Sequence, residues 1–128
     1  MKVMICEENV DKAKVISDLL NVYQFKLITL TSAVEFLKQV QTHKPAIIIV
    51  NENFPPKSGK NVLAQLRTNP VLRNIPVIMI SNKTDGEKIY NELYGDTLFE
   101  LMREPFKIKH LRHCVDRWTT FRSLYVKQ

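Results

Sequence analysis

Five short apolar segments alternate with helical patterns along the chain, and this alternation constrains the fold more than any other feature of the sequence. The segments are rich in β-branched residues and mostly continuous, which is typical of strands that are covered on both faces. They lie at Lys2–Cys6, Phe25–Leu30, Ala46–Val50, Pro76–Ile80 and Leu98–Met102. The last segment is the weakest, because Glu100 interrupts it.

Helical patterns fill the intervals between these segments, and Val10 and Val34 belong to their apolar faces. The patterns run from Asn9 or Asp11 to Tyr23, from Thr31 or Ser32 to Val40, over Gly59–Thr68, over Thr84–Tyr94, and from Phe106 to about Tyr125. Strict alternation predicts βαβ units, and therefore an α/β protein whose five-stranded parallel sheet carries helices on both faces. No repeat or linker divides the chain, so we expect one domain over 1–128, with a core at about 2–121 and a helix extension or linker at 122–128.

The working site of such a sheet lies at the carboxyl ends of its strands, near the point where the strand order reverses. Polar residues stand at four of these ends. They are Glu7 and Glu8, Asn51 to Asn53, Ser81 with Asn82, and Arg103 with Glu104.

At these four positions the sequence resembles the receiver domain of two-component response regulators, the CheY-like family. An acidic pair follows the first strand, as Glu7 and Glu8 do here. Residues 51–59 look like the family's D-x-x-M-P-x-x-S-G loop throughout, except at its first position. Residues 75–81 match its I-P-V-I run ending in Ser or Thr, and residues 104–106 its Lys-Pro-Phe, with Glu for Lys. The resemblance covers about residues 2–121. It implies a flavodoxin-like (βα)5 doubly wound fold and a role in phosphorelay signal transduction.

The departures from the family pattern fall on its chemistry. The resemblance places Asn51 where the family has the phosphoacceptor Asp, and a neutral amide cannot form a stable acyl phosphate. Glu104 stands where the family has the lysine that pairs with the phosphoryl oxygens. We therefore expect a degenerate pseudo-receiver that is not an enzyme and that works as a phosphorylation-independent protein–protein interaction module.

The acidic residues of this pocket pose two further questions. Glu104 either converges with Glu7 and Glu8, with Lys83 or Arg103 supplying a neutralising charge, or points to solvent. The resemblance also implies a Mg²⁺ site, for which Glu7, Glu8, Asn51 and Asn53 remain as ligand positions. One carboxylate is missing from that set, so we expect no strong metal site and at most a weak, millimolar one.

Ser81 matches the position whose hydroxyl turns toward the phosphoryl group in the family. The companion aromatic switch position falls on Leu101, with Phe99 two residues earlier, so we expect this switch to be lost. In one alternative, the protein is a signalling domain that is still phosphorylated, but on another residue, such as the hydroxyl of Ser58 or Ser81. Another is a flavoprotein on the same architecture, which the Glu7-Glu8 pair disfavours because carboxylates repel an anionic phosphate.

The last helix carries most of the net charge of +6, since residues 107–128 hold six basic side chains against Asp116 alone. Trp118, Phe121 and Tyr125 lie on its apolar stripe and are candidates for a partner surface, because interfaces are enriched in aromatic residues. The resemblance implies a signalling partner, an effector domain or a second copy on the face made by the fourth helix, fifth strand and fifth helix. Charge alone also allows nucleic-acid binding, which ranks last.

Two further features of the sequence are weaker signals. His110, His113 and Cys114 cluster at helical spacing, but no further Cys or His is near in sequence, so a zinc site is disfavoured. Cys6 and Cys114 make no disulfide framework, and the longest apolar run, Ala46–Val50, is too short to cross a bilayer. We therefore expect a cytoplasmic protein with no membrane segment.

Overall fold

The computed structural model describes residues 1–34, 36–54, 59–81 and 98–125. Their central element is a parallel sheet in the order β2-β1-β3-β4-β5. The strands are β1 (Lys2–Cys6), β2 (Lys26–Leu30), β3 (Ile47–Asn51), β4 (Val77–Ser81) and β5 (Phe99–Arg103). This order reverses direction between β1 and β3, so a crevice is expected at their carboxyl ends. The predicted parallel α/β architecture is confirmed.

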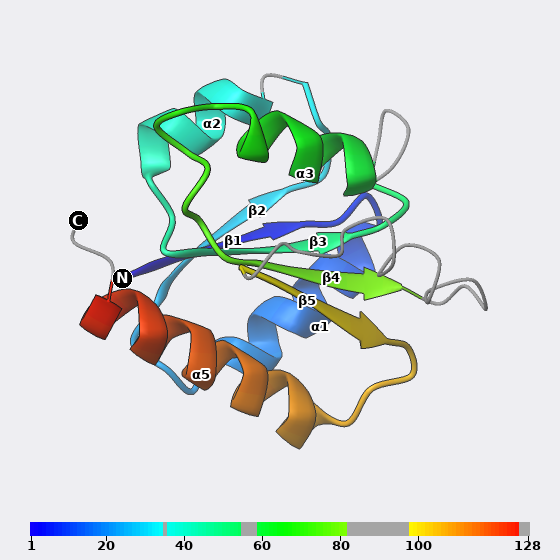
Figure 1. Ribbon diagram of the computed structural model, residues 1–128. Helices are drawn as coiled ribbons and strands as arrows, with labels where there is room; N and C mark the ends of the chain where they lie inside the picture. Colours follow the sequence, from blue (N-terminus) through cyan, green and yellow to red (C-terminus); the bar gives the residue numbers. More distant parts are fainter. Residues whose placement is uncertain (35, 55–58, 82–97, 126–128) are drawn as a thin grey trace.

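Helices cover both faces of the sheet (Figure 1). The helices α2 (Phe36–His43) and α3 (Gly59–Arg67) lie on one face, and α1 (Val10–Leu20) and α5 (Ile108–Tyr125) lie on the other. The predicted helix over 84–94 lies outside the described residues. Among those described, no helix is long and apolar enough to cross a membrane.

Two hydrophobic clusters hold these layers together, one on each side of the sheet. Each strand contributes side chains to both clusters, because successive side chains of a strand point to opposite faces of the sheet. Met4, Ile48 and Val50 belong to the cluster under α2 and α3. Ile5 and Ile49 belong to the cluster that includes Leu111 and Val115 of α5. Every residue of β3 is buried, as the continuous apolar run predicts.

Three of the strands are shifted by one residue from the expected segments. The apolar runs were expected to end at Val50, Ile80 and Met102, but the ladder continues through the polar residues that follow. Asn51 pairs with Ile80, and Ser81 pairs with Arg103. The two polar side chains are therefore fixed by strand hydrogen bonding rather than by a loop.

The two valines expected on inward helix faces lie outside the core. Val10 is 67% exposed and Val34 is 78% exposed. Asn9 caps α1, and its side chain accepts a hydrogen bond from the Lys12 amide at 3.0 Å, so Val10 sits in the open first turn. The Ser32 hydroxyl accepts from the Val34 amide at 3.1 Å, which holds a turn before α2 begins.

Candidate functional site

Asn51 occupies the centre of the strand ends, and both ends of its amide are engaged. Its Nδ2 donates to Glu7 Oε1 at 2.9 Å, and its Oδ1 accepts from the Asn53 amide at 2.9 Å. The side chain is buried, with 9% of the residue exposed. A carboxylate could not donate to Glu7, so this contact is specific to an amide or to a protonated acid.

Glu7 is the buried member of the acidic pair, and Glu8 is exposed. The second oxygen of Glu7, Oε2, accepts from the Asn9 amide at 3.1 Å. Glu7 therefore has a donor on each oxygen, one from a side chain and one from the backbone at the start of α1. Protein groups therefore satisfy both oxygens of this buried carboxylate.

Ser81 is paired with Glu52, a residue to which the sequence analysis gave no role. The Ser81 hydroxyl donates to Glu52 Oε1, and both residues are buried, at 0% and 2% exposed. Glu52 Oε2 has no hydrogen-bond partner within the described part of the chain. The only sequence signal for this contact was the position of Glu52 immediately after Asn51, at the end of a continuous apolar run. This contact fixes the orientation of the Ser81 hydroxyl.

Glu104 lies beside the same pocket rather than in open solvent. Its Oε2 is 3.7 Å from Lys12 Nζ of α1, and its side chain is 24% exposed. Glu7, Lys12 and Glu104 line one pocket together with the apolar side chains of Ile16 and Phe106. The neutralising cation is thus Lys12, which the sequence did not indicate.

The two cations that the sequence offered do not take this place. Arg103, at the end of β5, is exposed and has an interaction of its own, and Lys83 lies outside the described residues. Lys12 reaches Glu104 because α1 and the segment after β5 lie on the same side of the sheet (Figure 1).

A magnesium ion does not fit this set of donors well. Glu7 already accepts two hydrogen bonds, and Asn51 turns an N–H rather than an oxygen toward it. The Asn51 oxygen is held by the Asn53 amide, and the ammonium group of Lys12 lies near the pocket. Mg²⁺ requires several oxygen ligands in octahedral geometry, which this arrangement does not supply without rearrangement.

The candidate partner surface on α5 is described only in part. Trp118 is half-buried: it packs against the cluster beneath α5, and its Nε1 donates to Glu100 Oε1 at 3.0 Å. Trp118 therefore has a role inside the domain. The side chains of Phe121 and Tyr125 lie outside the described residues.

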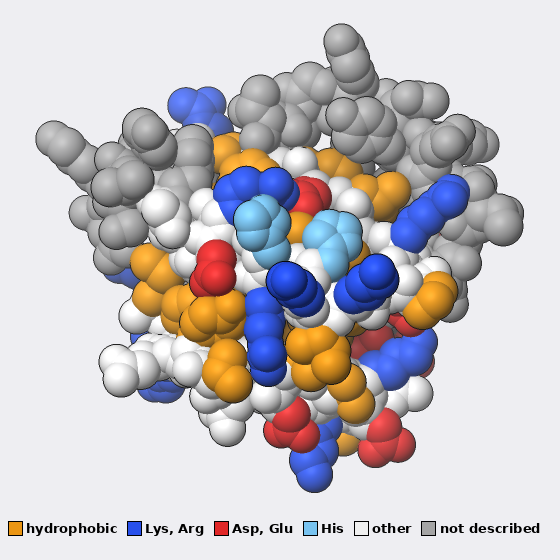
Figure 2. All heavy atoms as spheres, turned by 90° about the horizontal axis from the view of Figure 1, so that it is seen from below, with side chains coloured by type: hydrophobic (Ala, Val, Ile, Leu, Met, Phe, Trp, Pro, Cys, Tyr) orange, Lys and Arg blue, Asp and Glu red, His pale blue; other side chains and the backbone are white. Residues whose placement is uncertain are grey.

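The exposed face of α5 is basic (Figure 2). Lys and Arg side chains gather there around two histidines, with hydrophobic side chains between them. A shallow groove runs along the start of the helix, and its lining residues are Lys107, Ile108, Lys109, His110, Arg112, His113 and Asp116.

Polar contacts attach α5 to α1 and to the segment that follows α1. The Tyr23 hydroxyl donates to Asp116 Oδ2 at 3.1 Å, and Arg112 Nε donates to the Leu19 carbonyl at 3.0 Å. The pKa of Tyr23 is raised, mainly because burial desolvates the hydroxyl and secondly because it donates a hydrogen bond to Asp116. Burial likewise raises the pKa of the Cys6 and Cys114 thiols, so both are protonated at neutral pH.

Comparison with known proteins agrees with this architecture. The family model "Response regulator receiver domain" matches residues 3–116. The chain is 33% identical over 90 residues to the polar-differentiation response regulator DivK of Brucella ovis, covering 68% of this chain and 73% of DivK. It is 27% identical over 109 residues to hybrid signal transduction histidine kinase D of Dictyostelium discoideum, covering 85% of this chain but only 7% of that kinase.

Solved structures show the same fold. The signal receiver domain of a signal transduction histidine kinase from Syntrophus aciditrophicus superposes with a TM-score of 0.84 at 20% identity, over 99% of this chain and 94% of that one. The chemotaxis response regulator CheY4 of Vibrio cholerae has a TM-score of 0.79 at 20% identity, over 91% and 97% of the two chains.

Proposed function

The chain belongs to the response regulator receiver family, and from this premise we propose that it is a pseudo-receiver, which signals by binding a protein partner and accepts no phosphoryl group at Asn51. Receiver domains are signalling modules of two-component systems. In this proposal, the protein keeps the signalling role of a receiver domain but is not phosphorylated.

The observation that carries the proposal is the amide of Asn51. It replaces the nucleophile and at the same time donates to Glu7, which gives the pocket a stable arrangement with neither phosphate nor metal. Glu104 adds to this argument, because a carboxylate paired with Lys12 offers no donor to a phosphoryl oxygen. Mg²⁺ would bind this pocket only in the millimolar range.

The state of Ser81 supports a fixed conformation. Its hydroxyl is held by Glu52 and fully buried, so it neither turns toward the pocket nor offers itself to a kinase without local unfolding. This weighs against phosphorylation on Ser81. The other hydroxyl considered, Ser58, lies outside the described residues.

The partner surface proposed is the basic face of α5, and the partner proposed is a signalling protein with an acidic docking surface. Lys107, Lys109 and His113 are exposed there beside the exposed apolar side chain of Ile108. A surface that combines basic and apolar groups suits a partner that combines acidic and apolar ones.

The pocket is tested by two-dimensional amide NMR, with Mg²⁺ and then beryllofluoride, which mimics an aspartyl phosphate. The wild-type protein is expected to show no saturable shift at Glu7, Asn51 or Ser81 below millimolar Mg²⁺. The Asn51→Asp variant is the matched control, and its amides are expected to shift with Mg²⁺. Saturable shifts in the wild type that spread from Asn51 to α5 would contradict the proposal.

The surface is tested by cross-linking in cell extract. Lys109→Glu is expected to lose the partner's cross-linked band, whereas Lys44→Glu, an exposed site after α2, keeps it. Binding that falls steeply with salt and is competed by DNA would instead indicate nucleic acid as the partner. Cross-links between two copies that Lys109→Glu removes would indicate a homodimer.

A further inference from the structure

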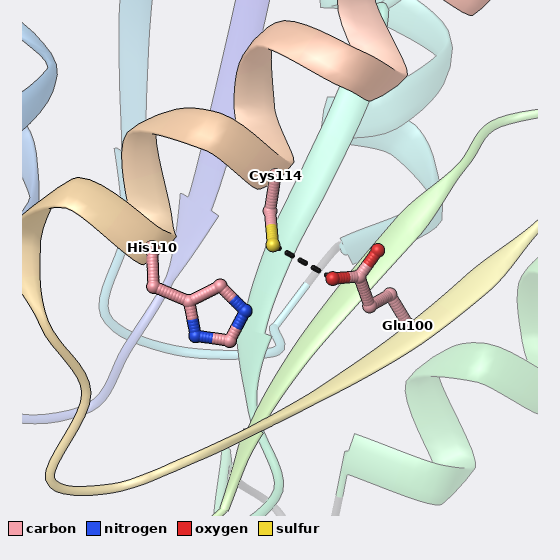
Figure 3. A group of neighbouring side chains, drawn as sticks. All are labelled: Glu100, His110 and Cys114. Carbon is pink, nitrogen blue, oxygen red and sulfur yellow. Dashed lines mark hydrogen bonds between the residues drawn. The ribbon is translucent and has the colours of Figure 1, made fainter.

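Three side chains with metal-binding atoms converge between β5 and α5 (Figure 3). Glu100 comes from β5, and His110 and Cys114 come from α5. One ligand atom from each residue lies within 4.8 Å of the other two. His110 and Cys114 share a helix face because they are four residues apart, and Glu100 supplies the third ligand type that the sequence pattern alone did not show.

The Glu100 carboxylate is already oriented for such a role. Its Oε1 accepts from Trp118 Nε1 at 3.0 Å and is paired with the Arg117 guanidinium. Its Oε2 points to Cys114, whose Sγ donates to it at 2.7 Å. Outer hydrogen bonds of this kind fix the ligand oxygen of a metal site. One oxygen is thus held by the protein, and the other faces the thiol.

We propose that Glu100, His110 and Cys114 bind one zinc ion, with water as the fourth ligand. Ligand atoms around tetrahedral zinc, with bonds of about 2.0–2.3 Å, lie roughly 3.3–3.8 Å apart. The Sγ and Oε2 atoms are 2.7 Å apart across their hydrogen bond, so they need to separate by less than about 1 Å once the proton leaves, and the exposed His110 imidazole needs to move inward. A set of one sulfur, one nitrogen and one oxygen suits zinc, whereas Mg²⁺ and Ca²⁺ require oxygen ligands.

Binding exchanges a proton for the metal. The Cys114 S–H bond breaks, the sulfur keeps the electron pair and binds Zn²⁺, and the proton passes to solvent. Thiolate, carboxylate and Zn²⁺ together carry no net charge, so the adjacent Arg117 guanidinium faces a neutral group. The site ties β5 to α5, on the opposite side of β5 from Leu101, and it does not depend on the function proposed for Asn51.

The test uses untagged protein and Co²⁺ as a spectroscopic substitute for zinc. One equivalent of Co²⁺ is expected to give a thiolate-to-cobalt charge-transfer band and the intense visible bands of tetrahedral cobalt. Zn²⁺ should displace it with release of one proton. Cys114→Ser should abolish the charge-transfer band.

The matched pair of variants is His110→Asn and His113→Asn, which remove neighbouring exposed histidines of α5. His110→Asn should weaken Zn²⁺ binding at least about tenfold, and His113→Asn should leave it unchanged. Both positions are exposed, so both variants are expected to fold, and circular dichroism checks this. A Co²⁺ complex without the thiolate band, or equal Zn²⁺ affinities for the two variants, would overturn the proposal.

Discussion

Replacing Asn51 by aspartate restores the residue that the receiver family uses, yet the structure predicts that it destabilises this protein. The substitution exchanges the Nδ2 group, which donates to Glu7 Oε1 at 2.9 Å, for an oxygen that repels it. Both residues are buried, so solvent screens the two carboxylates only partly. The variant must hold two negative charges in contact or take up a proton.

The magnitude follows from these two routes. Two charges about 4 Å apart at an effective dielectric constant of 20 repel by about 4 kcal/mol. Protonating one carboxyl of ordinary pKa at pH 7 also costs about 4 kcal/mol. The two routes agree, and structural relaxation lowers both, so Asn51→Asp should lose about 2–4 kcal/mol of unfolding free energy at pH 7 without metal.

The pH dependence has a definite sign. Like-charge repulsion raises the folded-state pKa of the pair above its unfolded value, so the penalty is largest at neutral pH and fades as pH falls toward about 4. Once protonated, the carboxyl group introduced by Asn51→Asp can also donate to Glu7, as the amide does. Mg²⁺ should reduce the penalty at pH 7, because it neutralises both carboxylates.

Urea unfolding followed by circular dichroism at pH 7 and pH 5, with and without Mg²⁺, measures these effects. The matched control is Asn53→Asp, the same chemical change at an exposed side chain, which should shift stability by less than about 0.5 kcal/mol. If Asn51→Asp is as stable as the wild type at pH 7 without metal, the account of the Glu7–Asn51 contact is wrong.

Two further contacts give independent predictions. Ser81→Ala removes the only described donor to the buried Glu52 carboxylate and should cost about 1–3 kcal/mol in urea unfolding; unchanged stability would mean that Glu52 does not depend on this hydroxyl. Tyr23 has a raised pKa, so its protonated form stabilises the fold below about pH 10 and this contribution is lost as pH rises through the folded pKa. Tyr23→Phe should therefore show a weaker loss of stability above about pH 10 than the wild type, and parallel curves would exclude this role.

The fold was predictable because most of its strands have a local signature. Continuous apolar runs bounded by polar residues marked β1, β3 and β4, and they placed Glu7, Asn51 and Ser81 at one edge of the sheet. The apolar runs did not show where the strands end. A polar residue after such a run can still belong to the strand when it pairs with a residue of the neighbouring strand. Asn51 and Ser81 are strand residues for that reason.

The partners of the site residues were not predictable, because they depend on contacts between distant segments. Lys12 meets Glu104, and Glu52 meets Ser81, across long sequence separations that carry no periodic signal. Glu100 was interpreted as a flaw in an apolar strand. It is instead the polar residue of β5 that faces α5, where Trp118 and Cys114 contact it.

Phosphoryl uptake by the intact protein decides whether the pocket still contains an acceptor. The wild type is incubated with acetyl phosphate and Mg²⁺ and its intact mass is measured, beside a receiver that carries the acceptor aspartate. We expect an unchanged mass for this protein and an added phosphoryl group on the control. The opposite result is a stoichiometric phosphoryl adduct on the wild-type chain that is stable in acid, labile in base and lost when a pocket carboxylate is substituted. Such an adduct would contradict the proposal that this protein is a pseudo-receiver.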